Sequence, residues 1–357
     1  MNILIIKLRH LGDVLVTTPC LSALKEAYPQ SQITMVVNQG TEDMVRDNPC
    51  LSEVIALERE PKKKPLEELG YQRRLIGRLR RKGFDLSIDF TGGDRGAILS
   101  FLSGAKERIG YHPKKQKQWW WKRAFTQTVK TPGDNRHVVE HHLDALRLLG
   151  INPPAMPLRF YWTPKDQETL NRILVEKGIN NQNPYVVVHP TSRWMFKTWR
   201  LEGYAEVIDY IQSKMDWAVM VTSGPDKKEL DAVQEITKRC RTKPLDLSGR
   251  LTLKQLGCLI AGGKFFFGVD SAPMHIAAAV GTPVIALFGP SGDHMWGPWG
   301  EGHLVIKKDW ACRPCGEDGC QGSKVSRCLT EIHTDEVISA IENLLASSPV
   351  TRHPSLL

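Results

Sequence analysis

The chain has 357 residues, 41% of them hydrophobic, which is enough apolar material for two ordinary domain cores and excludes a largely disordered chain. The formal net charge is +9, and the basic residues gather in two segments: residues 59–82 hold ten Lys and Arg against three Glu, and residues 106–130 hold eight against one. Such segments suit a polyanion or an anionic membrane surface, although a solvated basic helix gives the same pattern.

The first half of the chain alternates short apolar strands with helices. Strands are predicted at residues 2–7, 32–38, 52–58 and 85–90, and helices at 14–27, 43–49 and near 66–82. This alternation predicts a parallel sheet with right-handed crossovers. The half ends in the proline-rich stretch 152–164, which is typical of a linker.

The same pattern restarts in the second half. Strands are predicted at residues 185–190, 217–224, 244–249, 264–270 and 283–289, with helices between them and one more helix at 334–346. We therefore expect a domain at 1–160, a second at 165–330, and a C-terminal helix and tail at 331–357 that is a candidate to pack back on the N-terminal domain. Two such halves would form a cleft between the carboxyl ends of two sheets, where doubly wound folds bind ligands.

No segment is expected to span a membrane. The apolar run at residues 3–6 is too short for the core of a signal peptide, and the longest nearly apolar stretch, residues 276–288, is interrupted by Gly281, Thr282 and Pro283. A cytoplasmic protein is expected, in which the eight cysteines are mostly reduced.

Asp13 lies where the first predicted strand gives way to a helix, in IIKLRHLGDVLVTTPCL (5–21). It can act as an N-cap, because a carboxylate accepts hydrogen bonds from first-turn amides and suits the helix dipole. It can also act as a catalytic base at the edge of the sheet. The two roles are compatible, since one oxygen can cap while the other faces the cleft.

Two loops of the second half carry chemistry of their own. In VVVHPTSRWMFKTW (186–199), Thr191 and Ser192 offer hydroxyls and Lys197 offers a positive charge, so the loop is either a diphosphate cradle or a run of capping residues. In the second loop, within residues 265–291, Asp270, Ser271 and His275 converge on one strand end; a buried structural histidine is the alternative there.

Together with SGPDKKE (223–229) and residues 247–291, these stretches resemble the ADP-heptose:lipopolysaccharide heptosyltransferases, inverting glycosyltransferases of the GT-B type. The opening KLRHLGDVLVTTP is most similar to the branch that adds the third inner-core heptose. The resemblance implies an α/β GT-B fold, in which two Rossmann-like, doubly wound parallel-sheet domains face an interdomain cleft.

The resemblance also implies residue roles. Asp13 matches the general base, and Gly12 lets its loop approach the substrates. The matching donor-site residues are Thr191, Ser192 and Lys197 for the diphosphate, Glu229 for the ribose hydroxyls, and Asp270 for the donor sugar, with Ser271, Ala272 and His275 completing that loop. The family usually has glycine where this chain has Ala272 or Pro273.

No metal or other cofactor is expected for catalysis. No two aspartates are two residues apart, so the metal-binding Asp-x-Asp of many sugar transferases is missing. Lys197, backbone amides and a helix dipole can stabilise the departing ADP instead. Cys312, Cys315, Cys320 and Cys328 have a spacing that fits either a structural zinc knuckle or reduced thiols in a loop.

The acceptor that the resemblance implies is a lipid-anchored, phosphorylated oligosaccharide at the cytoplasmic face of the inner membrane, with which the protein would associate peripherally. The candidate acceptor-binding residues are His10, Gly12, Lys62, Lys63, Lys64 and Arg123. The stretch KKQKQWWWKR (114–123) suits sugar faces or a membrane interface. Nucleic acid is not expected as a partner, since no known binding motif accompanies the basic residues.

Two other functions fit the same sequence. The first is a heptosyltransferase that acts on the first or second core heptose. The second is a GT-B-like nucleotide-binding protein without transfer activity, which would need Asp13 only as a cap.

Overall fold

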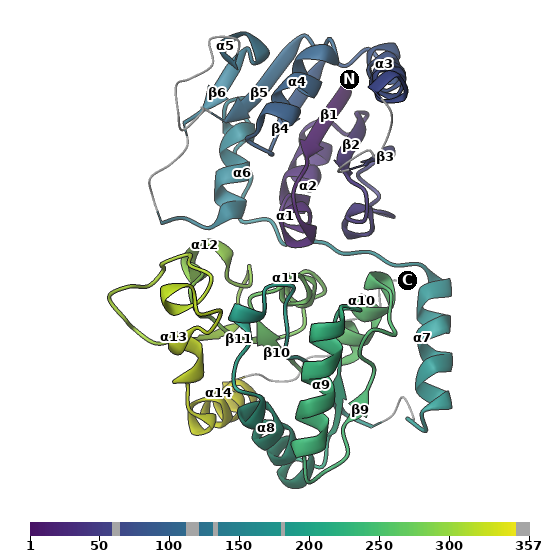
Figure 1. Ribbon diagram of the computed structural model, residues 1–357. Coiled ribbons are helices and arrows are strands. Elements are labelled where there is room, and N and C mark those ends of the chain that lie inside the picture. Colours follow the sequence, from purple (N-terminus) through teal and green to yellow (C-terminus); the bar gives the residue numbers. More distant parts are fainter. Residues whose placement is uncertain (59–64, 112–120, 131–134, 180–182, 348–357) are drawn as a thin grey trace. The chain divides into compact units, whose positions relative to one another are not determined.

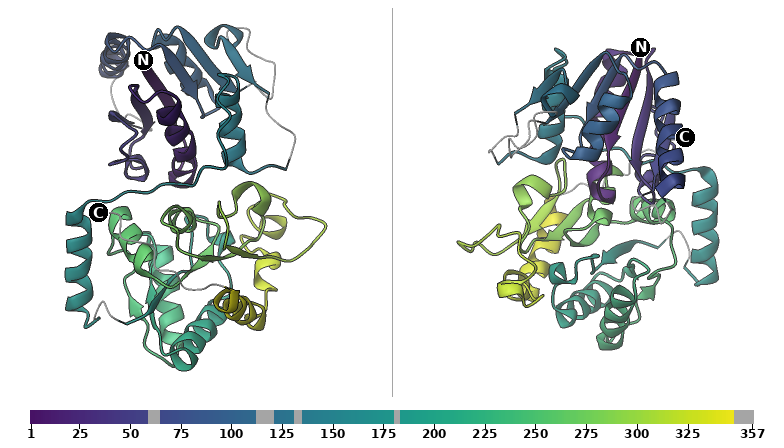
Figure 2. Two further views of the ribbon diagram at one scale, coloured as in Figure 1. Left: turned by 180° about the vertical axis from the view of Figure 1, so that it is seen from behind. Right: turned by 45° about the horizontal axis from the view of Figure 1, so that its top comes forward.

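The computed structural model describes residues 1–58, 65–111, 121–130, 135–179 and 183–347 (Figure 1). The chain forms two compact units, Met1–Tyr161 and Trp162–Leu357. The division lies inside the proline-rich stretch that the sequence predicts to be a linker. Each unit has one six-stranded parallel sheet with helices on both faces (Figure 2), so the prediction of two Rossmann-like, doubly wound units is confirmed.

The sheet of the first unit has the order β3-β2-β1-β4-β5-β6, in which all neighbouring strands are parallel. Its strands are β1 (Asn2–Lys7), β2 (Gln32–Asn38), β3 (Glu53–Leu57), β4 (Leu86–Asp89), β5 (Glu107–Tyr111) and β6 (Gln127–Val129). The helices are α1 (Leu11–Leu15), α2 (Thr18–Ala27), the 3-10 turn η1 (Glu42–Met44), α3 (Pro65–Arg81), α4 (Asp94–Leu102), α5 (Trp121–Ala124) and α6 (Val138–Arg147).

The helix predicted at residues 14–27 is wrong in one respect, because the structure divides this segment into α1 and α2. Pro19 lies in the first turn of α2. Proline lacks an N–H and clashes with the carbonyl four residues earlier, so a continuous helix through Leu15 and Pro19 is disfavoured. The break leaves Asp13 in a separate five-residue helix directly after β1.

The sheet of the second unit has the order β12-β11-β10-β7-β8-β9, which is the same arrangement counted from its own first strand, β7. Its strands are β7 (Tyr185–His189), β8 (Ala218–Val221), β9 (Leu245–Asp246), β10 (Phe266–Val269), β11 (Val284–Leu287) and β12 (Leu304–Ile306). The helices are α7 (Pro164–Glu176), η2 (Met195–Lys197), α8 (Leu201–Lys214), α9 (Lys227–Arg239), α10 (Leu253–Gly262), α11 (Ala272–Ala279), α12 (Asp293–Trp296), η3 (Cys320–Gly322), α13 (Arg327–Thr330) and α14 (Thr334–Ser347).

Helix α14 completes the core of the second unit. Its apolar residues Val337, Ile341 and Leu344 are buried in the same cluster as residues of α8 and the central strands. Before the helix, the indole of Trp199 donates to the carbonyl oxygen of Ile332 (3.0 Å) and ties the approach to α14 onto the start of α8. The apolar face of α14 is therefore occupied within its own unit.

Among the helices of the described residues, none combines the length and the apolar composition that crossing a bilayer requires.

Candidate functional site

In the second unit, strands β7 and β10 lie side by side, and Gly268 pairs with His189 near their carboxyl ends. The chain runs outward in opposite directions from this pair of strands, so it is the topological switch point of the sheet, where doubly wound folds bind ligands. The loop after β7 carries Thr191 and Ser192, and the loop after β10 carries Asp270 and Ser271. The strand order therefore gathers the predicted donor-site residues at one edge.

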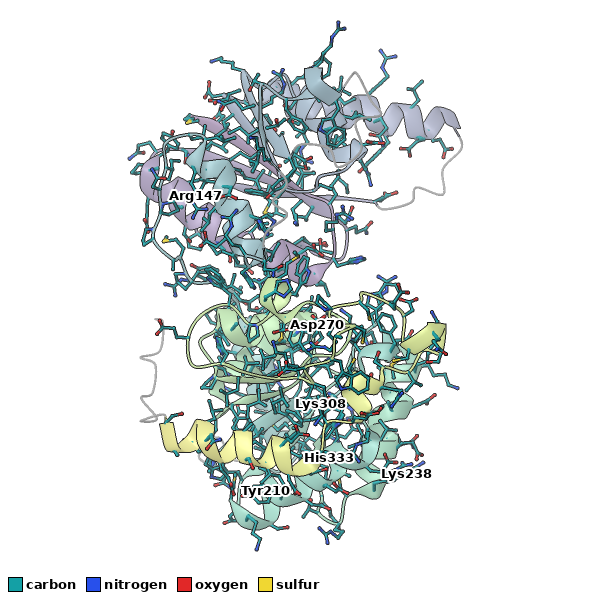
Figure 3. All side chains as sticks on the ribbon, turned by 90° about the vertical axis from the view of Figure 1, so that its left-hand side faces the viewer. Arg147, Tyr210, Lys238, Asp270, Lys308 and His333 are labelled. Atoms are coloured by element: carbon teal, nitrogen blue, oxygen red, sulfur yellow. The ribbon has the colours of Figure 1, made fainter. Side chains whose placement is uncertain are left out.

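The closest contact at this edge is an ion pair. Lys197 Nζ donates to Asp270 Oδ2 at 2.6 Å, and the two side chains are 21% and 11% exposed (Asp270 is labelled in Figure 3). Partial burial makes such a pair stronger than one at the open surface, because solvent screens it less. The pair fixes one cation and one carboxylate across the switch point.

A second contact joins Thr191 to Glu229, which lies in the first turn of α9. Thr191 Oγ1 donates to Glu229 Oε2 (2.7 Å), and the N–H of Gly224 donates to the same oxygen (3.4 Å). A side chain at position 224 would approach Glu229 Oε1 within 2.7 Å, so glycine is needed there for the carboxylate to sit against the loop. Among the residues that the structure describes, both donors to this carboxylate use Oε2, so Oε1 is available to accept from further groups.

The other predicted donor-site residues differ from one another in their hydrogen bonding and burial: these are Ser192, Ser271, Ala272 and His275. The Ser192 hydroxyl bonds within its own loop, donating to the Trp194 carbonyl (2.9 Å) and accepting from the Trp194 N–H (3.2 Å). Ser271 is the N-cap residue of α11, but its buried hydroxyl makes no hydrogen bond to the described residues. Ala272 is the first residue of that helix, and His275 is buried in its first turn.

In the first unit the corresponding switch point lies between β1 and β4, where Ile6 pairs with Asp89. Asp13 accepts from the N–H of His10 through Oδ2 (3.3 Å), and its Oδ1 lies 3.9 Å from Lys7 Nζ. His10 is the N-cap residue of α1 and Asp13 is its third residue, so the prediction that Asp13 is the N-cap is wrong. Its Oδ2 instead completes a capping box with the His10 N–H while Oδ1 faces a cation, and the side chain stays 20% exposed.

Lys7 was not predicted to be a site residue. A single lysine at the end of an otherwise apolar strand is the sequence feature that could have indicated it. Its ammonium is buried and donates to the Phe90 carbonyl (3.0 Å) and to His142 Nε2 (3.1 Å). An ammonium can only donate, so Nε2 must accept, and His142 Nδ1 then donates to the Val16 carbonyl at 3.3 Å. These bonds hold the charged end of Lys7 beside Asp13.

Burial governs the protonation of this cluster. It lowers the pKa of Lys7 to about 8, against the opposing attraction of Asp13. It lowers the pKa of His142 well below the ordinary value, with the charge of Lys7 adding to the effect. It raises the pKa of Asp89 to about 6, although the Thr91 N–H donates to its Oδ1 (2.8 Å). All three groups thus favour their neutral forms more than they would in water.

The remaining predicted residues are more scattered. His10 is the exposed N-cap residue of α1, Gly12 lies inside that helix, and Arg123 is exposed on α5. Lys62, Lys63 and Lys64 lie outside the described residues.

The four closely spaced cysteines precede α14: Cys312 and Cys315 lie in a loop, Cys320 begins the 3-10 turn η3, and Cys328 lies in α13. Cys312 and Cys315 are exposed, Cys320 is half-buried and Cys328 is buried. No group of three or more His, Cys, Asp or Glu side chains in the described parts of the chain is arranged to hold a metal ion.

Comparisons with known proteins agree with this architecture. The family model described as "Glycosyltransferase family 9 (heptosyltransferase)" matches residues 72–326. Lipopolysaccharide heptosyltransferase 3 of Escherichia coli is 35% identical over 343 residues, which cover 96% of this chain and 98% of that protein.

Two solved structures resemble the whole chain. The glycosyltransferase family 9 structure from Veillonella parvula has a TM-score of 0.83 and 23% identity, and the match covers 97% of each chain. The Escherichia coli heptosyltransferase WaaC with ADP has a TM-score of 0.75 and 18% identity over 96% of this chain and 100% of that one.

The raised pKa of Asp89 predicts a pH dependence of stability. A carboxyl whose pKa is raised to about 6 in the folded state contributes stability that is present below about pH 4 and is lost as the pH rises through about 6. The unfolding free energy of the wild type, relative to Asp89→Asn, should therefore fall by about 2 to 3 kcal/mol across this window. Urea unfolding at several pH values checks this, with Asp43→Asn as the control. A difference that stays constant with pH would contradict the assignment.

Proposed function

Because the chain belongs to glycosyltransferase family 9, the heptosyltransferases, we propose that it transfers heptose from ADP-heptose to the heptose region of the lipopolysaccharide inner core. The observation that carries this proposal is the nearly end-to-end likeness to an Escherichia coli protein named lipopolysaccharide heptosyltransferase 3. That likeness favours the third heptose as the one added. The fold supports it, because the chain shares the two-sheet GT-B architecture of ADP-bound WaaC.

We assign the donor to the edge of the second sheet where β7 and β10 end. Lys197 is the cation for the diphosphate, and its ammonium is already held at this edge by Asp270. Glu229 keeps Oε1 as an acceptor for the ribose hydroxyls, because its Oε2 is used by Thr191 and Gly224. Asp270 then faces the donor sugar, and the backbone amides of Ser271 and Ala272 at the start of α11, near His275, complete the loop.

The proposed reaction is a single displacement at the anomeric carbon. The acceptor hydroxyl oxygen forms the new bond to this carbon while the bond to the ADP oxygen breaks, and its electron pair leaves with ADP. Asp13 takes the hydroxyl proton, and the configuration at the anomeric carbon inverts. Preorganised positive charge at Lys197 stabilises the departing diphosphate, and this does not require a metal ion.

Lys7 gives Asp13 a fixed setting for this role. Its ammonium lies 3.9 Å from Oδ1 and is itself anchored by the Phe90 carbonyl and His142. Together with the hydrogen bond from the His10 N–H, this ammonium restrains the Asp13 carboxylate on two sides. Transfer also requires that Asp13 and the donor site act on the same donor and acceptor molecules. The interdomain cleft between the two units that would allow this stays a prediction.

We further propose that the acceptor is lipid-anchored and that the protein associates with an anionic membrane surface through its basic segments, at the cytoplasmic face of the inner membrane. Two basic residues at the end of α3 are engaged within their own unit: Arg78, in the helix, and Lys82, directly after it, pair with Glu53. The exposed Arg73 and Arg74 of the same helix leave positive charge at the surface.

Replacing Asp13 by Asn tests the general base. Asn keeps an oxygen that accepts from the His10 N–H, so the cap and the fold should persist. The turnover number should fall by about 10²- to 10⁴-fold because no group takes the acceptor proton. ADP affinity, measured by calorimetry, should stay within about twofold of the wild type. Asp43→Asn is the matched control and should keep full turnover. Wild-type turnover in a folded Asp13→Asn protein would contradict the assignment.

Replacing Lys197 by Ala tests the diphosphate site. Loss of a charge-assisted hydrogen bond, with Asp270 left unpaired, should weaken ADP binding by about tenfold or more. Lys214→Ala, at the exposed end of α8, removes the same charge from the same unit and should bind ADP normally. Unchanged affinity in Lys197→Ala would remove this residue from the site.

A further inference from the structure

The donor site described above holds less positive charge than its proposed ligand requires. A diphosphate joined at both ends carries a negative charge on each phosphate group, and the departing ADP gains another when the bond to the sugar breaks. Lys197 brings a single ammonium, and part of its charge is already balanced by Asp270 Oδ2 at 2.6 Å. Preorganised positive charge is what stabilises such a leaving group, so a second cation is expected at this edge.

The basic residues that can supply this charge lie in the loop after β7. This loop carries Arg193, Lys197 and Arg200, whereas the loop after β10 and the helix α11 that follows it hold no Lys or Arg. Arg200 is engaged elsewhere: its guanidinium carbon lies 5.3 Å from the centre of the Trp199 ring, and its Nη2 donates to the Ile332 carbonyl (3.3 Å). Arg193 is therefore the remaining cation of the two loops that meet at the switch point.

The exposed guanidinium of Arg193 is held by stacking rather than by hydrogen bonds. Its central carbon lies 5.5 Å from the centre of the Trp194 ring. Among the described residues, none forms a hydrogen bond or an ion pair with this guanidinium. Stacking uses the apolar face of the group, whereas its N–H donors lie in its plane, so these donors are available to a bound anion.

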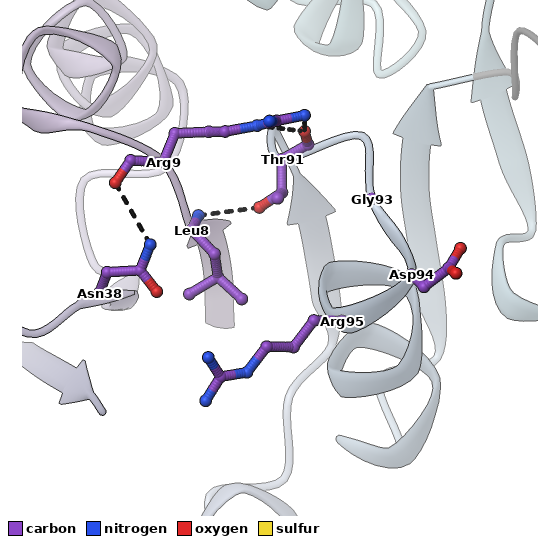
Figure 4. Close-up of a pocket in the computed structure, with 7 residues that line it drawn as sticks. All are labelled: Leu8, Arg9, Asn38, Thr91, Gly93, Asp94 and Arg95. Atoms are coloured by element: carbon purple, nitrogen blue, oxygen red, sulfur yellow. Dashed lines mark hydrogen bonds between the residues drawn. The ribbon is translucent and has the colours of Figure 1, made fainter. Parts of the chain in front are cut away.

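The arginines at the edge of the first sheet show the opposite situation. Arg9 donates through Nε and Nη2 to the Thr91 carbonyl (3.2 and 3.1 Å; Figure 4). Arg95 donates through Nη2 to the Glu58 carbonyl (2.9 Å). Both guanidinium groups thus use donors on backbone oxygens and hold segments of their own unit together. Arg193 has no such bond within the described part of the chain, so a contribution to the fold does not explain its position.

The indole of Trp194, on which Arg193 stacks, belongs to a loop that is fixed at several points. The Ser192 hydroxyl accepts from the backbone N–H of Trp194 (3.2 Å) and donates to its carbonyl (2.9 Å). The centre of the Phe196 ring lies 6.1 Å from that of Trp194, and the Phe196 carbonyl accepts from Ser326 Oγ (2.6 Å). The Trp194 side chain nevertheless stays 46% exposed. The loop therefore holds an accessible aromatic ring, and the guanidinium with it, in the same segment as the predicted diphosphate residues.

We propose that Arg193, stacked on Trp194, is a second cation for the diphosphate of the nucleotide sugar. The planar guanidinium donates two parallel hydrogen bonds to phosphate oxygens, which an ammonium cannot do, and it thereby complements Lys197. When the bond between the anomeric carbon and the ADP oxygen breaks, its electron pair stays on that oxygen, and the two cations share the charge that develops. Trp194 acts through Arg193, as a positioning residue. This role rests on the proposed function, in which the donor is ADP-heptose.

Calorimetric binding of ADP and of adenosine to the full chain tests this role. Arg193→Gln should weaken ADP binding by about tenfold or more, because charge-assisted hydrogen bonds are lost, and should leave adenosine binding unchanged. Arg193→Lys should recover part of the loss. Arg172→Gln, which removes an exposed charge from α7 of the same unit, should bind ADP normally. Equal losses of ADP and adenosine affinity in Arg193→Gln would indicate a merely structural role and overturn the proposal.

Trp194→Ala tests the stacking. It should weaken ADP binding in the wild-type background, whereas Trp194→Phe should keep much of the affinity because an aromatic ring remains. In the Arg193→Gln background, Trp194→Ala should have no further effect, since the ring acts through the guanidinium. An equal loss of ADP affinity in both backgrounds would overturn the positioning role of Trp194.

The same measurements separate this role from the function on which it rests. A wild-type chain that binds ADP, but releases none from ADP-heptose with any acceptor, would contradict the proposed transfer; the comparison of ADP affinities would still decide the role of Arg193. Equal ADP affinity of the wild type and Arg193→Gln would overturn that role alone, and a raised KM for the phosphorylated acceptor would then assign the guanidinium to the acceptor instead. Absence of ADP binding by the wild type would overturn both.

Discussion

In each sheet the first and fourth strands of the unit lie side by side, and the loops that follow them must leave from the same edge. This constraint decides which residues meet. It brings Lys197 and Asp270, which are 73 residues apart in the chain, into direct contact at the end of β7 and β10. In the first unit it places Lys7 and Asp89 on neighbouring strands, with Asp13 Oδ1 3.9 Å from Lys7 Nζ. The proposed chemistry depends on these two edges.

The two edges use their lysines differently. Lys7 is buried, and its ammonium is held by a carbonyl, an imidazole and the nearby carboxylate of Asp13, so it acts on protein groups alone. Lys197 is partly exposed and makes its ion pair with a single carboxylate, so the rest of its ammonium can contact a bound anion. A buried cation suits the orientation of a base, whereas an accessible one suits a leaving group that arrives and departs.

Much of the fold follows from local sequence pattern, because buried parallel strands are short apolar runs and their helices have apolar faces. Asp13 was predicted as the N-cap of the helix after the first strand, but His10 holds that position and Asp13 lies three residues later, as the acidic member of the capping box. Helix α7 was missed, although Thr163 and Asp166 form the capping box that marks its start. Lys7 was missed for a different reason: its partners Phe90 and His142 are distant in sequence, and only the fold brings them together.

The most direct test of this account is the release of ADP by the purified full chain, given ADP-heptose and inner-core acceptors that carry no, one or two heptoses. The account predicts release with the two-heptose acceptor and none above background with the shorter ones. Release with a shorter acceptor alone would keep heptose transfer and contradict the third-heptose assignment. Absence of release with all three, by a protein that still binds ADP-heptose, would contradict the proposed activity.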